Sequence, residues 1–324
     1  TDSHFGPYWA ITTAKPIIEI ESKPEVFSSE GNLGGITLAG QGVDNLLTFE
    51  VPMPMFIAMD EPKHSEQRKT VAPSLGPSPV ADMRADAIAR TAEVLDGLPI
   101  GETFDWVDRV SMELTTQMLA RLFDFPWEER RKLAIWSDIL ADIESFASEE
   151  ARKHRLETAY EVGVAFHALW ESKKGQPRTN DLTSTMLNSE SMSQMSDGEF
   201  IGNMILLIVG GNDTTRHSMS AYAHILGQYP DQRAKLEADV SLAANAVQAI
   251  VRRPTPLAHM RRTATPDDVL DGHPHRGGGR PQHGSQGQGQ GPGQRRPPSR
   301  HRQESPYSGG GGGGGESLGN ITGV

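Results

Sequence analysis

The chain has 324 residues, 36% of them hydrophobic and 23% charged, enough apolar sequence for one large globular domain or two ordinary ones. A net charge of −11 argues against nucleic-acid binding as the main role, because that role needs a basic surface. No apolar run reaches the roughly 18 residues of a membrane span, and the lack of cysteine excludes disulfides and cysteine-ligated metal sites.

Local patterns predict a mainly helical chain with a small β region near the N-terminus. We expect strands over residues 10–13 and 16–20, where β-branched residues are bounded by lysine and proline. The next helix is expected to follow the break formed by Pro77 and Pro79. Apolar residues at three-to-four spacing predict amphipathic helices over residues 82–95, 103–123 and 128–146.

A long apolar helix is expected from Ser196 to about Leu226. Ser196, with Glu199 three residues on, matches a capping box, which satisfies two backbone N–H groups at a helix start. Gly210 and Gly211 interrupt the apolar run, although a glycine inside a helix costs about 1 kcal/mol relative to alanine. We therefore expect the two glycines to admit a flat, bulky group where a Cβ would clash. A buried core helix with a kink is the alternative.

A second candidate site lies upstream. His64 and Arg68 are four residues apart, so they share one face of a helix if residues 63–71 are helical. Together they present N–H donors suited to a carboxylate. By spacing alone, a solvated surface pair is the commoner explanation.

Composition divides the chain near residue 268. Residues 1–268 carry the helical patterns, whereas residues 269–324 hold more than half of the 34 glycines, with glutamine, arginine and proline filling much of the rest. Such a tail cannot bury enough apolar area to offset its ordering entropy, so we expect disorder. A shifted reading frame and a natural low-complexity tail both explain it. Because the chain begins with neither a signal peptide nor a methionine, we expect a cytoplasmic fragment.

Three segments together resemble the cytochrome P450 family. Residues 210–215 match the Ala/Gly-Gly-x-Asp-Thr-Thr pattern of its oxygen-binding helix. Residues 60–68 are similar to its Asp-Pro-Pro-x-His-x-x-x-Arg stretch, with Glu61 replacing the first proline, and residues 255–264 look like the segment after its K helix. The resemblance implies a mainly α, partial P450 fold with a small β region, followed by the disordered tail.

The same resemblance implies a haem b site. Arg262 would reach one haem propionate, with Arg261 as the competing choice, while His64 and Arg68 hold the other. Asp213 and Thr214 are the implied catalytic residues, which deliver protons to dioxygen beneath the glycine gap, a general-acid role. The implied cofactor-binding residues are His64, Arg68, Gly210, Gly211 and Arg262.

Six further stretches of the sequence resemble a narrower group, the soluble bacterial P450s that hydroxylate alkane termini. It implies a hydrophobic substrate such as a medium-chain alkane, O2, a ferredoxin and an NADH-linked ferredoxin reductase. We expect the substrate to enter between residues 36–47 and the helix ending near Phe146. The similar stretches are residues 101–108, 113–120, 122–126, 130–133, 136–138 and 257–262.

Two departures from the family pattern concern the haem side. Ala249 stands where the family's Glu-x-x-Arg pair has its glutamate, and an unpaired buried Arg252 would cost about 3–5 kcal/mol. The axial cysteine is absent, and its thiolate promotes O–O cleavage in these enzymes. No metal ligand is assigned, and we predict that the chain is inactive as it stands. A catalytically dead relic and a helical binding module are the alternatives.

Overall fold

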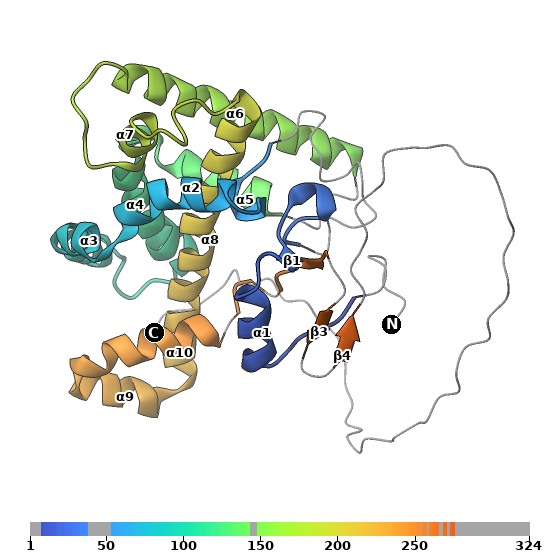
Figure 1. The fold of residues 1–324 in the computed structure, drawn as a ribbon. Helices are drawn as coiled ribbons and strands as arrows, with labels where there is room; N and C mark the ends of the chain where they lie inside the picture. The colour runs from blue at the N-terminus through green and yellow to red at the C-terminus, as the bar shows by residue number, and fades with distance from the viewer. Residues whose placement is uncertain are drawn as a thin grey trace, which may run out of the picture.

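The computed structural model describes residues 8–37, 53–142, 148–253, 255–257, 259–265, 268–270 and 273–275. The described chain is mainly helical and is organised around one long helix, α8 (Asp197–Gln228), which runs vertically among the other helices in Figure 1. The elements that pack most extensively against α8 are η5 (Val107–Met112, a π-helical turn), α4 (Glu113–Phe123), α5 (Arg131–Ala141) and α6 (Glu149–Lys173).

Shorter elements surround this centre. The other α-helices are α1 (Ala14–Glu21), α2 (Lys63–Val71), α3 (Pro77–Asp96), α7 (Leu182–Leu187), α9 (Pro230–Ala238) and α10 (Ala243–Arg252). Single 3-10 turns occur at η1 (Gly31–Leu33), η3 (Phe56–Ala58), η4 (Ala72–Leu75), η6 (Trp127–Glu129) and η8 (Val240–Leu242).

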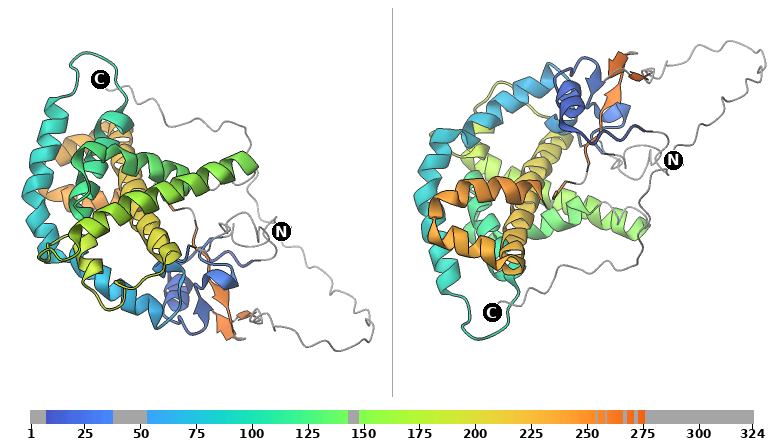
Figure 2. Two further views of the ribbon diagram at one scale, coloured as in Figure 1. Left: turned by 90° about the horizontal axis from the view of Figure 1, so that it is seen from above. Right: turned by 90° about the horizontal axis from the view of Figure 1, so that it is seen from below.

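The β structure consists of two small antiparallel pairs. β1 (Phe27–Ser28) pairs with β2 (Thr263–Ala264), and β3 (Asp268–Leu270) pairs with β4 (His273–His275). Both views in Figure 2 place the blue N-terminal segment beside the orange strands at one corner of the molecule. The β1–β2 pair therefore ties the start of the described chain to its end.

The two strands predicted near the N-terminus are wrong. Residues 14–21 form the helix α1, and residues 10–13 form no strand. Pro16 is the third residue of α1, where the missing N–H has no intrahelical partner to lose, so proline does not oppose a helix there. A short apolar run of this kind fits a helix and a strand equally well.

The predicted helices occur, with altered ends. α3 begins at Pro77 and not after Pro79 as predicted, because proline is well tolerated in the first turn of a helix. The helix expected over residues 128–146 divides into η6 and α5, and residues 143–147 lie outside the described residues. The helices expected over residues 63–71 and from Ser196 to about Leu226 are confirmed.

The capping box at the start of α8 forms only in part. Ser196 Oγ accepts the hydrogen bond from the backbone N–H of Glu199 at 3.3 Å, as predicted. The Glu199 carboxylate instead accepts from Lys63 and Gln67 on α2. The start of α8 therefore also anchors α2.

The boundary of the predicted tail differs from the structure. β4 lies within residues 269–324, so strand pairing continues a few residues beyond residue 268. The expectation of disorder from residue 276 onward falls outside the described residues.

Burial changes along α8. Its first half enters the main hydrophobic core, where Met204 and Ile208 have no exposed surface. Phe123 of α4 and Phe166 of α6, both fully buried, meet there edge to face with ring centroids 5.1 Å apart. The last buried residue of α8 is Asn212, and no residue from 213 to 228 is buried.

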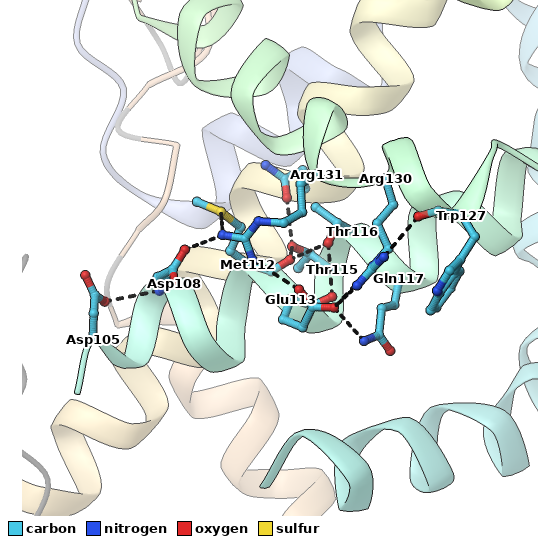
Figure 3. A network of polar contacts seen from close by, with 11 residues as sticks. Asp105, Asp108, Met112, Glu113, Thr115, Thr116, Gln117, Trp127, Arg130 and Arg131 are labelled. Atoms are coloured by element: carbon cyan, nitrogen blue, oxygen red, sulfur yellow. Dashed lines mark hydrogen bonds and ion pairs between the residues drawn. The ribbon is translucent and has the colours of Figure 1, made fainter. Parts of the chain in front are cut away.

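A polar cluster fixes α5 against α4 (Figure 3). Glu113 of α4 accepts hydrogen bonds from Gln117 at 2.8 Å, from Arg130 at 2.7 Å and from Arg131 at 3.1 Å. Arg131 also reaches Asp108. Burial opposes ionisation of Glu113, but these donors outweigh it and hold the pKa of the carboxyl below its ordinary value.

We predict that Glu113→Gln lowers the free energy of unfolding by about 1–2 kcal/mol at pH 7, because partly buried donors lose a charged acceptor. A depressed pKa stabilises the fold above the ordinary glutamate value and loses that effect as pH falls through the lowered pKa. The gap between wild type and variant should therefore shrink in acid.

Urea unfolding at several pH values measures this difference. Glu129→Gln is the control. Glu129, like Glu113, forms an ion pair, in this case with Lys132, but its side chain is 48% exposed. A pH-independent difference, or an equal loss in the control, would contradict the role of the Glu113 cluster.

Candidate active site

The two glycines of α8 have different surroundings. A Cβ on Gly211 would lie 2.7 Å from Leu119 Cδ2, so this glycine lets α4 pack closely against α8. A Cβ on Gly210 would meet nothing within 4 Å, and Gly210 is exposed. Helix packing therefore accounts for Gly211, and Gly210 is the glycine that borders open space.

Thr214 lies one helical turn after Gly210 on the same side of α8. Its hydroxyl donates a hydrogen bond to the Gly210 carbonyl oxygen at 2.8 Å. This local bond is typical of threonine within a helix. The hydroxyl must leave that carbonyl before it can donate to a molecule beside Gly210.

Asp213 forms an ion pair with Arg216, which also pairs with Asp138. Arg216 Nη2 lies 2.6 Å from Asp213 Oδ1, and Arg216 Nη1 lies 3.1 Å from Asp138 Oδ2 on α5. Burial disfavours the charged guanidinium, but the Asp138 and Asp213 carboxylates outweigh burial and raise the pKa of Arg216. The Asp213 carboxylate thus accepts a hydrogen bond from a guanidinium that Asp138 also binds.

His64 and Arg68 lie on one face of α2, as predicted. His64 Nδ1 donates to the Phe56 carbonyl oxygen at 2.8 Å, which leaves Nε2 for another partner. Arg68 is exposed and forms no ion pair with any residue that the structure describes. Arg68 therefore retains N–H groups that suit a carboxylate, and His64 Nε2 can donate to one when the ring is protonated on both nitrogens.

His64 and Arg68 on α2 lie apart from Asp213 and Thr214 on α8, although the two helices are joined. α2 is fastened to the first turn of α8 by Lys63 Nζ, which lies 3.0 Å from Glu199 Oε2. At a rise of 1.5 Å per residue, Glu199 is about 17 Å along α8 from Gly210. In the described chain no hydrogen bond or ion pair joins His64 or Arg68 to Asp213 or Thr214.

The two arginine candidates near β2 differ in their contacts. Arg261 is buried, and its guanidinium donates to the carbonyl oxygens of Gly34 at 2.8 Å and Leu33 at 3.2 Å. Gly34 has φ of 106° at this close approach, a conformation that favours glycine. Arg262 is paired with Glu21 at 2.8 Å. The guanidinium of Arg261 is thus used in hydrogen bonds that hold the fold together. Arg262 could bind a propionate only if its ion pair with Glu21 breaks.

The destabilisation expected from Ala249 is not supported. Arg252 is exposed at the end of α10, so the missing glutamate leaves no buried charge. Its neighbour Arg253 instead donates to the Tyr229 hydroxyl at 2.7 Å and lies over the tyrosine ring. Arg252 is exposed and has no ion pair among the described residues, so the cost of about 3–5 kcal/mol for a broken buried pair does not apply.

Sequence reasoning missed Arg216 and Asp138. Arg216 is three residues from Asp213, a spacing that brings helical side chains together, and that signal was available. Asp138 is 78 residues away in sequence, and only the packing of α5 on α8 brings it there. The predicted substrate entrance is not described, since residues 38–52 and 143–147 lie outside the described residues.

Two further features of the described residues bear on function. Within the described ranges, no helix combines the length and apolar character needed to cross a bilayer. The same part of the chain contains no cluster of three or more histidine, cysteine, aspartate or glutamate side chains suited to a metal ion.

Comparison with protein-family models gave no match. Linalool 8-monooxygenase from Pseudomonas putida is 32% identical over 275 residues, which cover 84% of this chain and 67% of that protein. Steroid C26-monooxygenase from Mycolicibacterium smegmatis is 32% identical over 265 residues, covering 81% and 63%.

Solved structures agree with these relatives. Cytochrome P450-153 from Novosphingobium aromaticivorans is 47% identical with a TM-score of 0.77, covering 86% of this chain and 68% of that one. CYP153D17 from Sphingomonas sp. PAMC 26605 is 56% identical with a TM-score of 0.77 and the same coverage. The chain thus spans about two thirds of the length of three of these four relatives. It belongs to the cytochrome P450 family of monooxygenases.

Proposed function

We propose that this chain provides the oxygen-side half of a haem-dependent monooxygenase and does not complete the reaction by itself. The observation that carries the proposal is the change of burial along α8. The helix leaves the core after Asn212, and Gly210, Asp213 and Thr214 all lie where side chains are at least partly open to solvent.

The residues present fit a haem on one side only. The guanidinium of Arg68 and, in the doubly protonated ring, Nε2 of His64 suit the carboxylates of haem propionates, and neither group has a hydrogen-bond partner among the described residues. The open space beside Gly210 would accommodate a flat ring. No cysteine occurs in the 324 residues, so the chain has no thiolate to bind iron. We therefore expect haem to bind weakly and to be loosely held.

When bound with its thiolate ligand, haem supplies the oxygen-activating chemistry of the family. The part played by this chain's own residues is to hold and move protons near Gly210. Thr214 turns its hydroxyl away from the Gly210 carbonyl to donate outward. Asp213 accepts a proton when Arg216 moves away from it toward Asp138. The Asp138 carboxylate keeps the guanidinium of Arg216 paired during that movement.

A hydrophobic small molecule, such as a medium-chain alkane, is the proposed substrate. Support comes from relatives whose names specify hydrophobic molecules: linalool, a steroid and methyl-branched lipids. Burial of an alkane contributes about 0.8 kcal/mol per CH2 without any polar contact. O2, a ferredoxin and an NADH-linked ferredoxin reductase complete the proposal, which places the reaction in the cytoplasm.

Gly210→Ala separates stability from function. Alanine favours the helix by about 1 kcal/mol and its Cβ meets no atom within 4 Å, so the haem-free chain should become more stable. If the open space receives haem, the added methyl group should weaken haem binding.

Thermal unfolding and titration with haem, followed by absorbance, measure the two effects. Gly227→Ala is the matched control, because Gly227 also lies on α8 with nothing near its Cβ. Equal haem affinity in the two variants would show that Gly210 has no part in the site.

We further predict that the purified chain forms no terminal alcohol from a medium-chain alkane when supplied with haem, ferredoxin, reductase and NADH. The reason is the missing thiolate, without which O–O cleavage is not promoted. Gas chromatography of the products against a haem-only control makes the measurement. Alcohol above that control would refute the proposed inactivity.

A further inference from the structure

The backbone of Met53 and Pro54, in the segment before α2, packs directly against the first half of α8. A Cβ on Gly202 would lie 2.4 Å from the Pro54 carbonyl oxygen and 2.6 Å from that of Met53. Both atoms belong to the backbone, so no side-chain movement could relieve the clash. Only glycine at position 202 lets this segment run so close to the helix.

The next residue, Asn203, holds the same segment by a hydrogen bond. Asn203 is fully buried, and its Oδ1 accepts from the backbone N–H of Phe56 at 2.8 Å. Its Nδ2 donates to Gln67 Oε1 at 3.0 Å and also contacts Met195 Sδ at 3.2 Å. The carboxamide therefore cannot turn over without losing a partner on each side.

Phe56 connects Asn203 to the predicted haem-binding histidine. Its N–H is held by Asn203, and its carbonyl oxygen accepts from His64 Nδ1 at 2.8 Å. The phenyl and imidazole rings also pack together, with centroids 6.2 Å apart. The position of one residue thus decides where the Nδ1 side of His64 points.

We propose that Asn203, seated by Gly202, is a positioning residue for His64. By fixing Phe56, it holds the ring through Nδ1–H, so that Nε2 points away from Phe56 and donates to a carboxylate once the ring carries a proton on both nitrogens. The inference rests on the proposed function in one respect, which is that the carboxylate belongs to a haem propionate. The hydrogen-bond relay itself exists without haem and is testable alone.

The first test reads the tautomer of His64 in the haem-free full chain from its ring-nitrogen chemical shifts. Wild type should carry the proton on Nδ1, and Asn203→Ala should populate the Nε2–H form. Asn212→Ala is the matched control, since Asn212 is an equally buried asparagine of α8 whose Oδ1 accepts from Thr115 at 2.7 Å. It should lose stability and keep the wild-type tautomer.

An Nε2–H tautomer in wild type would overturn the inference even if Asn203→Ala fails to fold. An unchanged tautomer in folded Asn203→Ala, or the same change in Asn212→Ala, would overturn it as well.

The second test titrates each variant with haem. Asn203→Ala should bind about tenfold more weakly than Asn212→Ala, the loss expected from one misplaced charge-assisted hydrogen bond. A lost tautomer with unchanged haem affinity would support the positioning role and contradict haem binding by His64. The two claims therefore fail separately.

Discussion

The structure depends on α8, a helix of 32 residues whose environment changes halfway along its length. Its first half is buried among α4, α5 and α6, and the core side chains there have almost no exposed surface. Most helical stability in proteins comes from such packing, so the buried half supports the half that follows. The second half can therefore carry glycine and polar residues at positions that the core does not cover.

Each half of α8 organises one part of the candidate site. The first half fixes α2 and the Phe56 segment through Glu199 and Asn203, which places His64 and leaves its Nε2 unused. The second half holds Asp213 beside Arg216, which Asp138 of α5 shares. The Glu113 cluster fastens α5 to α4 and so supports that shared ion pair. Because one helix links both parts, their spacing does not depend on loops.

The sequence was sufficient where the determinants are local. Periodicity and spacing predicted α2, α3, α4 and α8, and family motifs identified the chain. Residues 16–20, which lie within α1, were mistaken for strand because a short apolar run with a proline fits either structure. Arg252 was expected to be buried but is exposed, since the environment of α10 depends on distant packing. The Asn203–Phe56 bond spans 147 residues, and Asp138 lies 78 residues from Arg216, so no local pattern indicates either contact.

We propose that the oxygen-side surface of a P450 occurs here in a chain with no cysteine to ligate iron. Haem-iron ligation decides the electronic properties that favour O–O cleavage. The most direct measurement is the carbon monoxide difference spectrum of the reduced, purified chain after addition of haem. We predict that the red-shifted band of thiolate-ligated haem is absent. Appearance of that band would contradict it.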